Sequence, residues 1–395
     1  MGSFRLQGAA PVAPSSGGSP PARTVGRMAA RGRGALGRWA AVGLLVAVLL
    51  ALPSVVAALP ADDADVPAAD LRVAVLASAD VGFSGYAVSA GGLALPVSDR
   101  LTDVADLFSD RTLMRVWWRG PDEHRVDVVS GAGETGVHRD PGGTWTWDFE
   151  AATATRGTPA SLALPTPPDL LPAALGRRLL SEATDDELAR AGARRVAGRD
   201  TLGLRVVPAD AASSVDRVDV WVDPASGLPL QVEVFGEGAD LPALDTRFLD
   251  LDVAVPLVDV VAFTPPPDAT VLTAPDTEEL IAQAEERAPD VPLPGELAGL
   301  SRRAFEGVPD AVGVYGRGIT LLAAAPVPRR LAEGLREALT ASPDAVTDEL
   351  GTRVAAGPLG LMLVDPGDGP AYVLTGTVTL DALADAARRL PGAVS

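Results

Sequence analysis

Two histidines, His124 and His138, are the side chains of this sequence that exchange protons most readily near neutral pH. Each stands close to an acid, His124 beside Glu123 and His138 two positions before Asp140. Such pairs serve in acid–base catalysis or bind metals, but we interpret both histidines as solvent-facing loop residues. Ser84 is a candidate nucleophile without a base motif nearby, so we interpret it as a polar residue at the start of a strand.

Most other groups that enzymes use are absent from the sequence. None of the 395 residues is cysteine and all 33 basic residues are arginine, which excludes thiolate nucleophiles, disulfides, cysteine–zinc sites and catalytic lysines. The chain has no G-x-S-x-G, H-E-x-x-H, Walker A or G-x-G-x-x-G motif, and the Gly-Arg-Gly at 316–318 is too short for a phosphate loop. We therefore predict that the protein is not an enzyme and has no catalytic residue, metal site or cofactor.

The elements that would position a binding site follow a basic N-terminal region. Residues 1–60 carry a charge of +6 and the remainder carries −25. An uncharged run at 39–59 is long enough, as a helix, to cross a bilayer, and the arginines before it orient its start toward the cytoplasm. We predict a disordered basic cytoplasmic tail over 1–38 and a transmembrane signal anchor over 39–60. The main domains then lie outside the cytoplasmic membrane, in a single-pass protein.

One alternative concerns this N-terminal region. A cleaved signal peptide competes with the anchor, and Met28 as the true start would favour that interpretation. The acidic balance of the remaining chain argues against binding to nucleic acid.

From about residue 70 to 275, apolar and polar residues alternate with the period of β-strands. Each strand has one apolar and one charged face, which predicts an antiparallel sheet with one face in water. Helices are expected between about 167 and 193, where Thr184 and Glu187 fit a capping box. These helices are too short to cover the whole sheet, so we predict a half-open β-barrel with a helical lid over an apolar groove. A barrel filled by its own side chains is the alternative.

The apolar strand faces supply the candidate ligand cavity, which would take an acyl chain or an apolar peptide. The residues assigned to it are Met114, Val116, Trp118, Val126, Val128, Trp145, Trp147, Phe149, Val218, Val220, Leu230 and Val232. Trp117 and Trp221 fall on the polar faces of their strands, where exposed tryptophans mark a possible partner surface. Cover by a helix or loop is the alternative for these two residues.

Residues 112–149, 218–235 and 263–271 resemble the LolA-like lipoprotein carrier superfamily. The likeness lies in the spacing of strands and turns, including the run TLMRVWWRGPDEHRVDVV, the turn DPASGLPL and the proline-rich FTPPPDATV. It covers about residues 70–273 and implies a half-barrel whose hydrophobic cavity binds acyl chains. We accordingly predict a LolA-like domain over 61–275.

The C-terminal part predicts a second, smaller domain. A helix and a proline-rich linker are expected over 276–299, and residues 300–395 show an α+β pattern whose last helix Thr379 can cap. The order GVYGRGITLLAA…GPLGLMLV…AYVLTGTV resembles the C-terminal domain of RseB-like proteins, so the whole chain is most similar to the RseB/MucB group of sigma-factor regulators.

This resemblance implies a regulatory protein that binds the outer part of an anti-sigma factor and senses lipid or lipoprotein. The alternative is a lipid or lipoprotein carrier of the cell envelope, and simple carriers lack a domain equivalent to 300–395. Related actinobacterial lipid carriers are anchored by a lipidated cysteine. This chain has no cysteine, so the segment 39–60 is the expected tether.

Overall fold

The computed structural model describes residues 42, 46, 60–91, 111–130, 133–157, 165–274, 291–305, 311–366 and 370–392. Pro60–Ser395 form one compact unit. The predicted tail over 1–38, nearly all of the segment 39–60 and the predicted linker helix after residue 275 lie outside the described residues. Among the residues that are described, no helix is long and apolar enough to cross a membrane.

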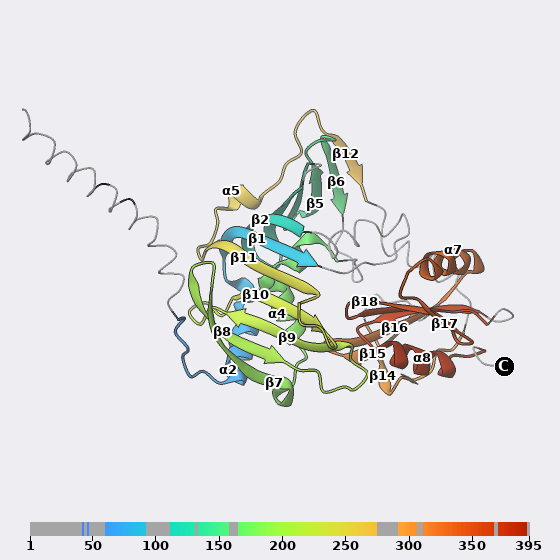
Figure 1. Ribbon diagram of the computed structural model, residues 1–395. Helices are drawn as coiled ribbons and strands as arrows, with labels where there is room; N and C mark the ends of the chain where they lie inside the picture. Colours follow the sequence, from blue (N-terminus) through green and yellow to red (C-terminus); the bar gives the residue numbers. More distant parts are fainter. Residues whose placement is uncertain are drawn as a thin grey trace, which may run out of the picture. The chain divides into compact units, whose positions relative to one another are not determined.

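A large curved sheet makes up the first part of the compact unit, in the order β12-β6-β5-β4-β3-β2-β1-β11-β10-β9-β8-β7 (Figure 1). Its strands are β1 (Phe83–Gly91), β2 (Arg111–Gly120), β3 (Glu123–Val129), β4 (Glu134–Asp140), β5 (Gly143–Asp148), β6 (Thr153–Gly157), β7 (Leu188–Val196), β8 (Arg199–Val206), β9 (Val215–Val222), β10 (Pro229–Gly236), β11 (Leu244–Asp252) and β12 (Thr270–Thr273). Neighbouring strands are antiparallel as predicted, except that β12 runs parallel to β6. The described strands leave β12 and β7 as free edges, so the sheet does not close into a barrel.

Short helices lie before and within this sheet. They are α2 (Ala68–Ala77), η1 (Ser78–Asp80), η2 (Pro167–Leu170), α4 (Pro172–Leu180), η3 (Asp185–Glu187) and α5 (Val258–Val261). The predicted capping box is confirmed, because Glu187 accepts hydrogen bonds from the backbone and hydroxyl of Thr184. The helical prediction up to residue 193 is wrong, since this box closes a single 3₁₀ turn and β7 begins at Leu188.

A smaller sheet follows, in the order β13-β14-β15-β16-β20-β19-β18-β17. It consists of β13 (Glu296–Leu297), β14 (Leu300–Arg303), β15 (Gly313–Arg317), β16 (Thr320–Val327), β17 (Val346–Asp348), β18 (Gly351–Ala356), β19 (Leu359–Val364) and β20 (Ala371–Gly376), with helices α7 (Arg329–Thr340) and α8 (Leu380–Arg389). α8 packs on one face with Tyr315 and Tyr372, and α7 packs on the other with Val354 and Leu363. The hydroxyl of Thr379 accepts a hydrogen bond from the backbone N–H of Ala382, which confirms the predicted cap of α8.

Strand register decides which residues share a face of the large sheet, because side chains alternate along each strand. The face that packs against α2 and α4 is called the inner face here. Val126 is paired with Val137, and Val137 with Thr146, so Thr146 continues the inner face into β5. Trp145 and Trp147 therefore lie on the outer face, and their assignment to the same cavity as Val126 is wrong.

The physical reason is that the outer face is not in water at this end of the sheet. The segment after β11 crosses it, and the ring of Phe263 lies 5.8 Å from the ring of Trp145 and 5.9 Å from that of Trp147. At β5 the outer face is thus covered by Phe263, whereas Thr146 on the inner face is exposed, so the rule that the apolar face points to the helices fails here.

Candidate functional site

The predicted cavity residues on the inner face are packed into the protein core. Met114, Val116, Val126, Val218, Val220, Leu230 and Val232 are fully buried, Trp118 is nearly so, and Val128 is partly buried. They form two apolar clusters with side chains of the helices, among them Val75 of α2 and Leu180 of α4. A lipid cavity on this face stays a prediction, since a ligand would have to enter a layer that these helices fill.

The aromatic residues of the β5 region form a separate group on the outer face. Trp147 is buried, and its ring lies 5.7 Å from that of Phe149. Phe149 follows the end of β5 and is 41% exposed, so it does not line the inner face either.

The two tryptophans predicted as a partner surface do lie on the outer face. Trp221 is buried, however, so this residue is covered and not exposed. The guanidinium of Arg194 lies 3.8 Å from the centre of its ring, and its Nε1 donates to Glu233 at 2.9 Å. Trp117 is half-buried beneath Arg125, at 4.9 Å. Long arginine side chains thus cover the tryptophans that the pattern places toward solvent.

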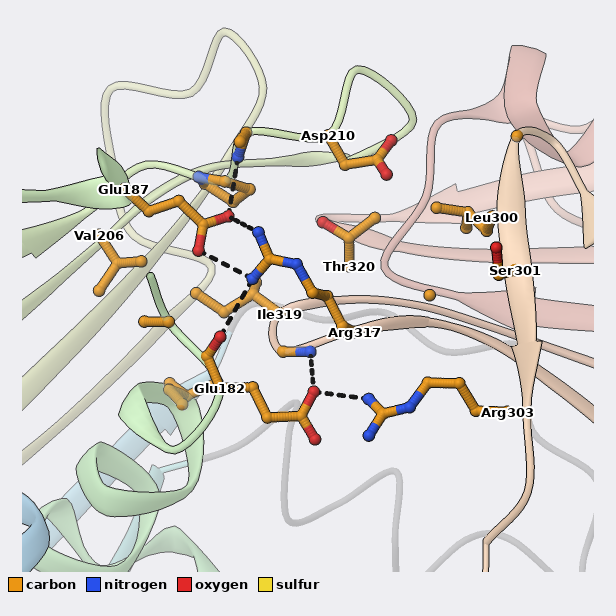
Figure 2. A pocket seen from close by; sticks show the side chains of 17 residues that line it. Glu182, Glu187, Val206, Asp210, Leu300, Ser301, Arg303, Arg317, Ile319 and Thr320 are labelled. Atoms are coloured by element: carbon orange, nitrogen blue, oxygen red, sulfur yellow. Dashed lines mark hydrogen bonds and ion pairs between the residues drawn. The ribbon is translucent and has the colours of Figure 1, made fainter. Parts of the chain in front are cut away.

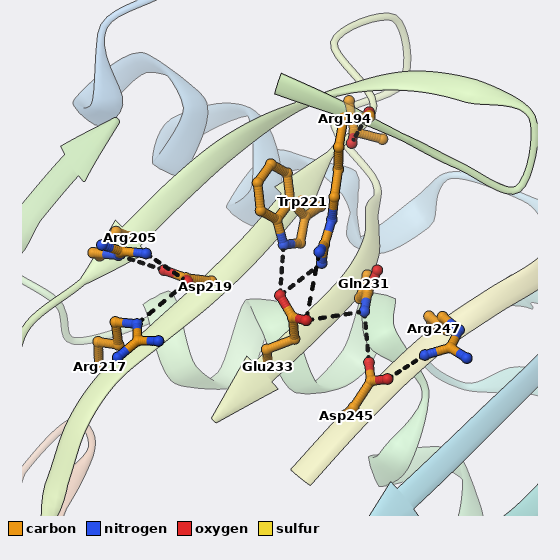
Figure 3. A network of polar contacts seen from close by, with 10 residues as sticks. Arg194, Arg205, Arg217, Asp219, Trp221, Gln231, Glu233, Asp245 and Arg247 are labelled. Carbon is orange, nitrogen blue, oxygen red and sulfur yellow. Dashed lines mark hydrogen bonds and ion pairs between the residues drawn. The ribbon is translucent and has the colours of Figure 1, made fainter. Parts of the chain in front are cut away.

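A network of charged groups spans the outer face of β7–β11 (Figure 3). Glu233 also accepts a hydrogen bond from Arg194 at 2.6 Å, and Gln231 bridges it to Asp245. Further along β8 and β9, Arg205 donates two hydrogen bonds to Asp219, which raise the pKa of Arg205. These pairs neutralise charge between neighbouring strands, a role that needs no ligand.

Both histidines are buried on strands, which corrects their interpretation as loop residues. His124 lies in β3, stacks on Trp118 at 4.5 Å and has its Nδ1 3.3 Å from the carbonyl of Gly120. His138 lies in β4 with its Nδ1 3.3 Å from the carbonyl of Val261. Burial lowers the pKa of each histidine. No group of three or more potential metal ligands occurs in the part of the chain that the structure describes.

A pocket of about 540 Å³ lies where the large and small sheets meet, and we take this junction pocket as the candidate functional site (Figure 2). The large sheet side contributes the segment after α4, η3 and the start of the β8–β9 connection. The small sheet contributes β14 and the β15–β16 turn. None of the predicted cavity residues lines it.

Two ion pairs cross the junction pocket. Arg317 donates to both carboxylate oxygens of Glu187, at 2.9 and 3.0 Å. Arg303 donates to Glu182 at 2.6 Å, and the same carboxylate oxygen accepts the backbone N–H of Gly318 at 2.8 Å. Each pair joins an acid of the large sheet side to an arginine at the end of a strand of the small sheet.

These contacts keep both acids ionised. Burial raises the pKa of Glu187, but hydrogen bonds from Arg317, Thr184 and the backbone of Ala209 outweigh it and hold the pKa at about 2. The hydrogen bond from Arg303, followed by that from Gly318, lowers the pKa of Glu182. At neutral pH both acids are therefore ionised and paired with arginines across the pocket.

Backbone pairing provides a second attachment between the sheets. Ser213 forms an antiparallel bridge with Val378. The backbone N–H of Ser214 donates to Thr377 at 3.2 Å, and that of Thr379 donates to Ala212 at 2.9 Å. The β8–β9 connection thus holds the small sheet just before α8.

Sequence reasoning missed the junction pocket. Glu187 stood out as a capping residue and Arg317 lies in the Gly-Arg-Gly motif, but they are far apart in sequence and no local pattern links them. The backbone of Gly316 and Gly318 has positive φ, so the motif forms the tight β15–β16 turn that presents Arg317.

The sequence and the fold of this chain are similar to those of known proteins. Residues 155–260 match the family model of the MucB/RseB N-terminal domain, whereas no curated protein sequence matches the chain. A solved complex of Pseudomonas aeruginosa MucA/MucB has 20% identity, covers 81% of this chain and 96% of its own, and has a TM-score of 0.45. A LolA superfamily protein from Nitrosomonas europaea has 12% identity, covers 50% and 98%, and has a TM-score of 0.23. The family match confirms the resemblance predicted from the sequence: this chain is similar to the MucB/RseB proteins.

Proposed function

We propose that this chain is an extracytoplasmic regulatory protein that binds the outer part of an anti-sigma factor and so controls an envelope-stress sigma factor. The observation that carries the proposal is the match of residues 155–260 to the MucB/RseB N-terminal domain. The small sheet of β13–β20 supports the regulator over a simple carrier, which lacks such a second part.

The proposed ligand is a lipid or acyl chain, which would occupy the half-open barrel between the inner face and its helical lid. The apolar side chains of this face support the proposal, because they would stay buried against an acyl chain as they now are against α2 and α4. Entry requires α4 to move away from β10.

The proposed tether is the uncharged segment 39–60, with the charged unit that follows it outside the cytoplasmic membrane. Support comes from the six arginines before the segment and from the absence of cysteine, which removes a lipid-modified cysteine as an anchor.

The proposed coupling between ligand and partner acts through the junction pocket. A movement of α4 would reach Glu182, which follows the helix and bonds to Arg303. Changes at the helical lid would thereby alter the position of the small sheet and the affinity for a partner.

The test is purification of the tagged full chain from the membranes of its own host, with mass spectrometry of bound proteins and lipids. Recovery of a membrane-spanning anti-sigma factor is the expected result. Deletion of the gene should also change the transcripts of the matching sigma factor. Lipid without an anti-sigma factor, and no change in those transcripts, would favour the carrier alternative and overturn the regulator.

A variant pair tests the coupling. Arg317→Met removes an arginine of the junction pocket and should change partner recovery, whereas Arg389→Met removes an exposed ion pair with Glu296 inside the small sheet unit and should not. Equal recovery in both variants would contradict coupling through the pocket.

A further inference from the structure

A segment that we call the outer strap, Val255–Phe263, crosses the outer face of the large sheet between β11 and β12. Its short helix α5 lies against β2, β3 and β4. Within the strap, Val261 is fully buried, whereas Leu257 is 75% exposed and Val258 is 51% exposed. The strap thus rests on the sheet with one side and exposes apolar side chains on the other.

Besides the contacts of Phe263 with Trp145 and Trp147, three further contacts hold the outer strap on the sheet. The ring of Phe263 packs 4.6 Å from the ring of His138. The Nδ1 of His138 lies 3.3 Å from the carbonyl of Val261, and Arg119 donates to the carbonyl of Pro256. His138 takes part in both an aromatic and a polar contact, so the docking of the strap depends on the state of this ring.

The other ring nitrogen of His138 is buried and has no hydrogen-bond partner. It faces the space above Gly136, where a Cβ atom would lie 3.0 Å from His138 Nε2 and 2.9 Å from Asp127 Oδ1. Because Nδ1–H donates to the carbonyl of Val261, Nε2 is the unprotonated nitrogen of a neutral ring. A proton added there would enter a buried site, since His138 is only 3% exposed.

The charged groups around His138 come from two strands. Arg125 and Asp127 face it from β3 and Asp140 from β4, whereas β5 presents Trp145 and the strap presents Phe263. Asp127 is fully buried and already accepts hydrogen bonds of 2.9 and 2.7 Å from Arg125. The carboxylate nearest to the imidazole is therefore neutralised by an arginine.

Burial and the charge of Arg125 lower the pKa of His138, against the opposing effects of the Val261 carbonyl, Asp127 and Asp140. The docked strap thus favours the neutral ring. Lifting the strap exposes the ring to water, where protonation is easier, so a fall in pH favours the lifted state.

We propose that His138 is a proton-sensitive lock, which holds the outer strap on the sheet while it is neutral and releases the strap when it is protonated. This device lies on the opposite face of the sheet from the proposed lipid layer and is independent of the proposed anti-sigma partner. Release would uncover the aromatic surface of Trp145 and Trp147 when the compartment becomes acidic.

Hydrogen exchange of the purified full chain, followed in residues 60–395, tests the proposal. The backbone N–H groups of Val260 and Ala262 donate within the strap and report its opening. In the lifted state the ring would be exposed to water, where the ordinary pKa of a histidine is about 6.5. After correction for intrinsic rates, exchange should therefore rise by up to about tenfold between about pH 7.5 and about pH 5.5.

His138→Asn should abolish that rise, because the amide keeps a donor near the carbonyl of Val261 but does not titrate. His124→Asn is the matched control, since His124 is also buried and bonded to a backbone carbonyl, yet lies on the inner face. It should keep the rise. Persistence of the rise in His138→Asn, equal loss in both variants, or no rise in the wild type would overturn the lock.

A second measurement covers the case in which His138→Asn fails to fold. The chain contains only two histidines, so the His124→Asn variant assigns both imidazole resonances in an NMR titration. We expect a pKa for His138 below 6.5, with strap resonances shifting at the same midpoint. A midpoint at or above 6.5, or strap resonances that do not follow it, would refute the proposal.

Discussion

Arg317 of β15 donates two hydrogen bonds to the carboxylate of Glu187, which closes the 3₁₀ turn before β7. The same carboxylate caps that turn through Thr184 and accepts the backbone N–H of Ala209. One side chain therefore ends a local turn and also joins the two sheets. Its removal affects both the large sheet and the position of the small one.

Glu187→Gln should lower the free energy of unfolding by roughly 2–3 kcal/mol, because the neutral amide cannot pair with Arg317 or accept all of these donors. Chemical denaturation measures the change. The control is Glu296→Gln, whose exposed partner is Arg389, and it should change the value by less than about 0.5 kcal/mol. Similar losses in the two variants would show that the junction pair is no stronger than a surface pair.

The stability supplied by Glu187 should depend on acid pH. The folded pKa of about 2 lies below the ordinary value of 4.5, so the contribution is present above about pH 4.5 and is lost as the pH falls toward 2. The difference in Tm between wild type and Glu187→Gln should therefore shrink across this range. A difference that stays constant down to about pH 2 would contradict the depressed pKa.

Trp221→Phe should cost about 1–2 kcal/mol, since it removes the hydrogen bond to Glu233 and reduces the ring beneath Arg194. Trp117→Phe is the comparison, because Trp117 is half-buried on the same face and also lies under an arginine. It should cost less than Trp221→Phe in thermal unfolding. The reverse order would mean that the buried indole hydrogen bond contributes little.

Gly227 and Gly238 allow a clean test of crowding against α2. Both have positive φ, +73° for Gly227 and +69° for Gly238. A Cβ atom added at Gly227 would lie 2.6 Å from the carbonyl oxygen of Ala74, whereas a Cβ atom added at Gly238 would meet open space. Gly238→Ala should cost about 1 kcal/mol, the penalty for φ alone. Gly227→Ala should cost about 3 kcal/mol, and equal costs in chemical denaturation would exclude a clash with the helix.

Local features of the fold followed from residue spacing. The alternation in β2, β9 and β10 predicted their strands, and Thr184 and Thr379 predicted the capped starts of two helical segments, because these effects act within a few residues. The face of Trp145 could not be predicted in this way. It depends on register carried through β3 and β4 and on the cover supplied by Phe263.

The sequence by itself determined that the chain has a mostly antiparallel sheet and a smaller α+β part after it, since the alternation of apolar residues, the turns and the caps are local features. It also determined the likeness to MucB/RseB proteins, which residues 155–260 carry. Only the tertiary structure decided that Glu187 meets Arg317 and that His138 lies under the strap beside Val261. Each of these pairs joins residues more than 100 positions apart, and such contacts arise from strand order and packing, which no short pattern encodes.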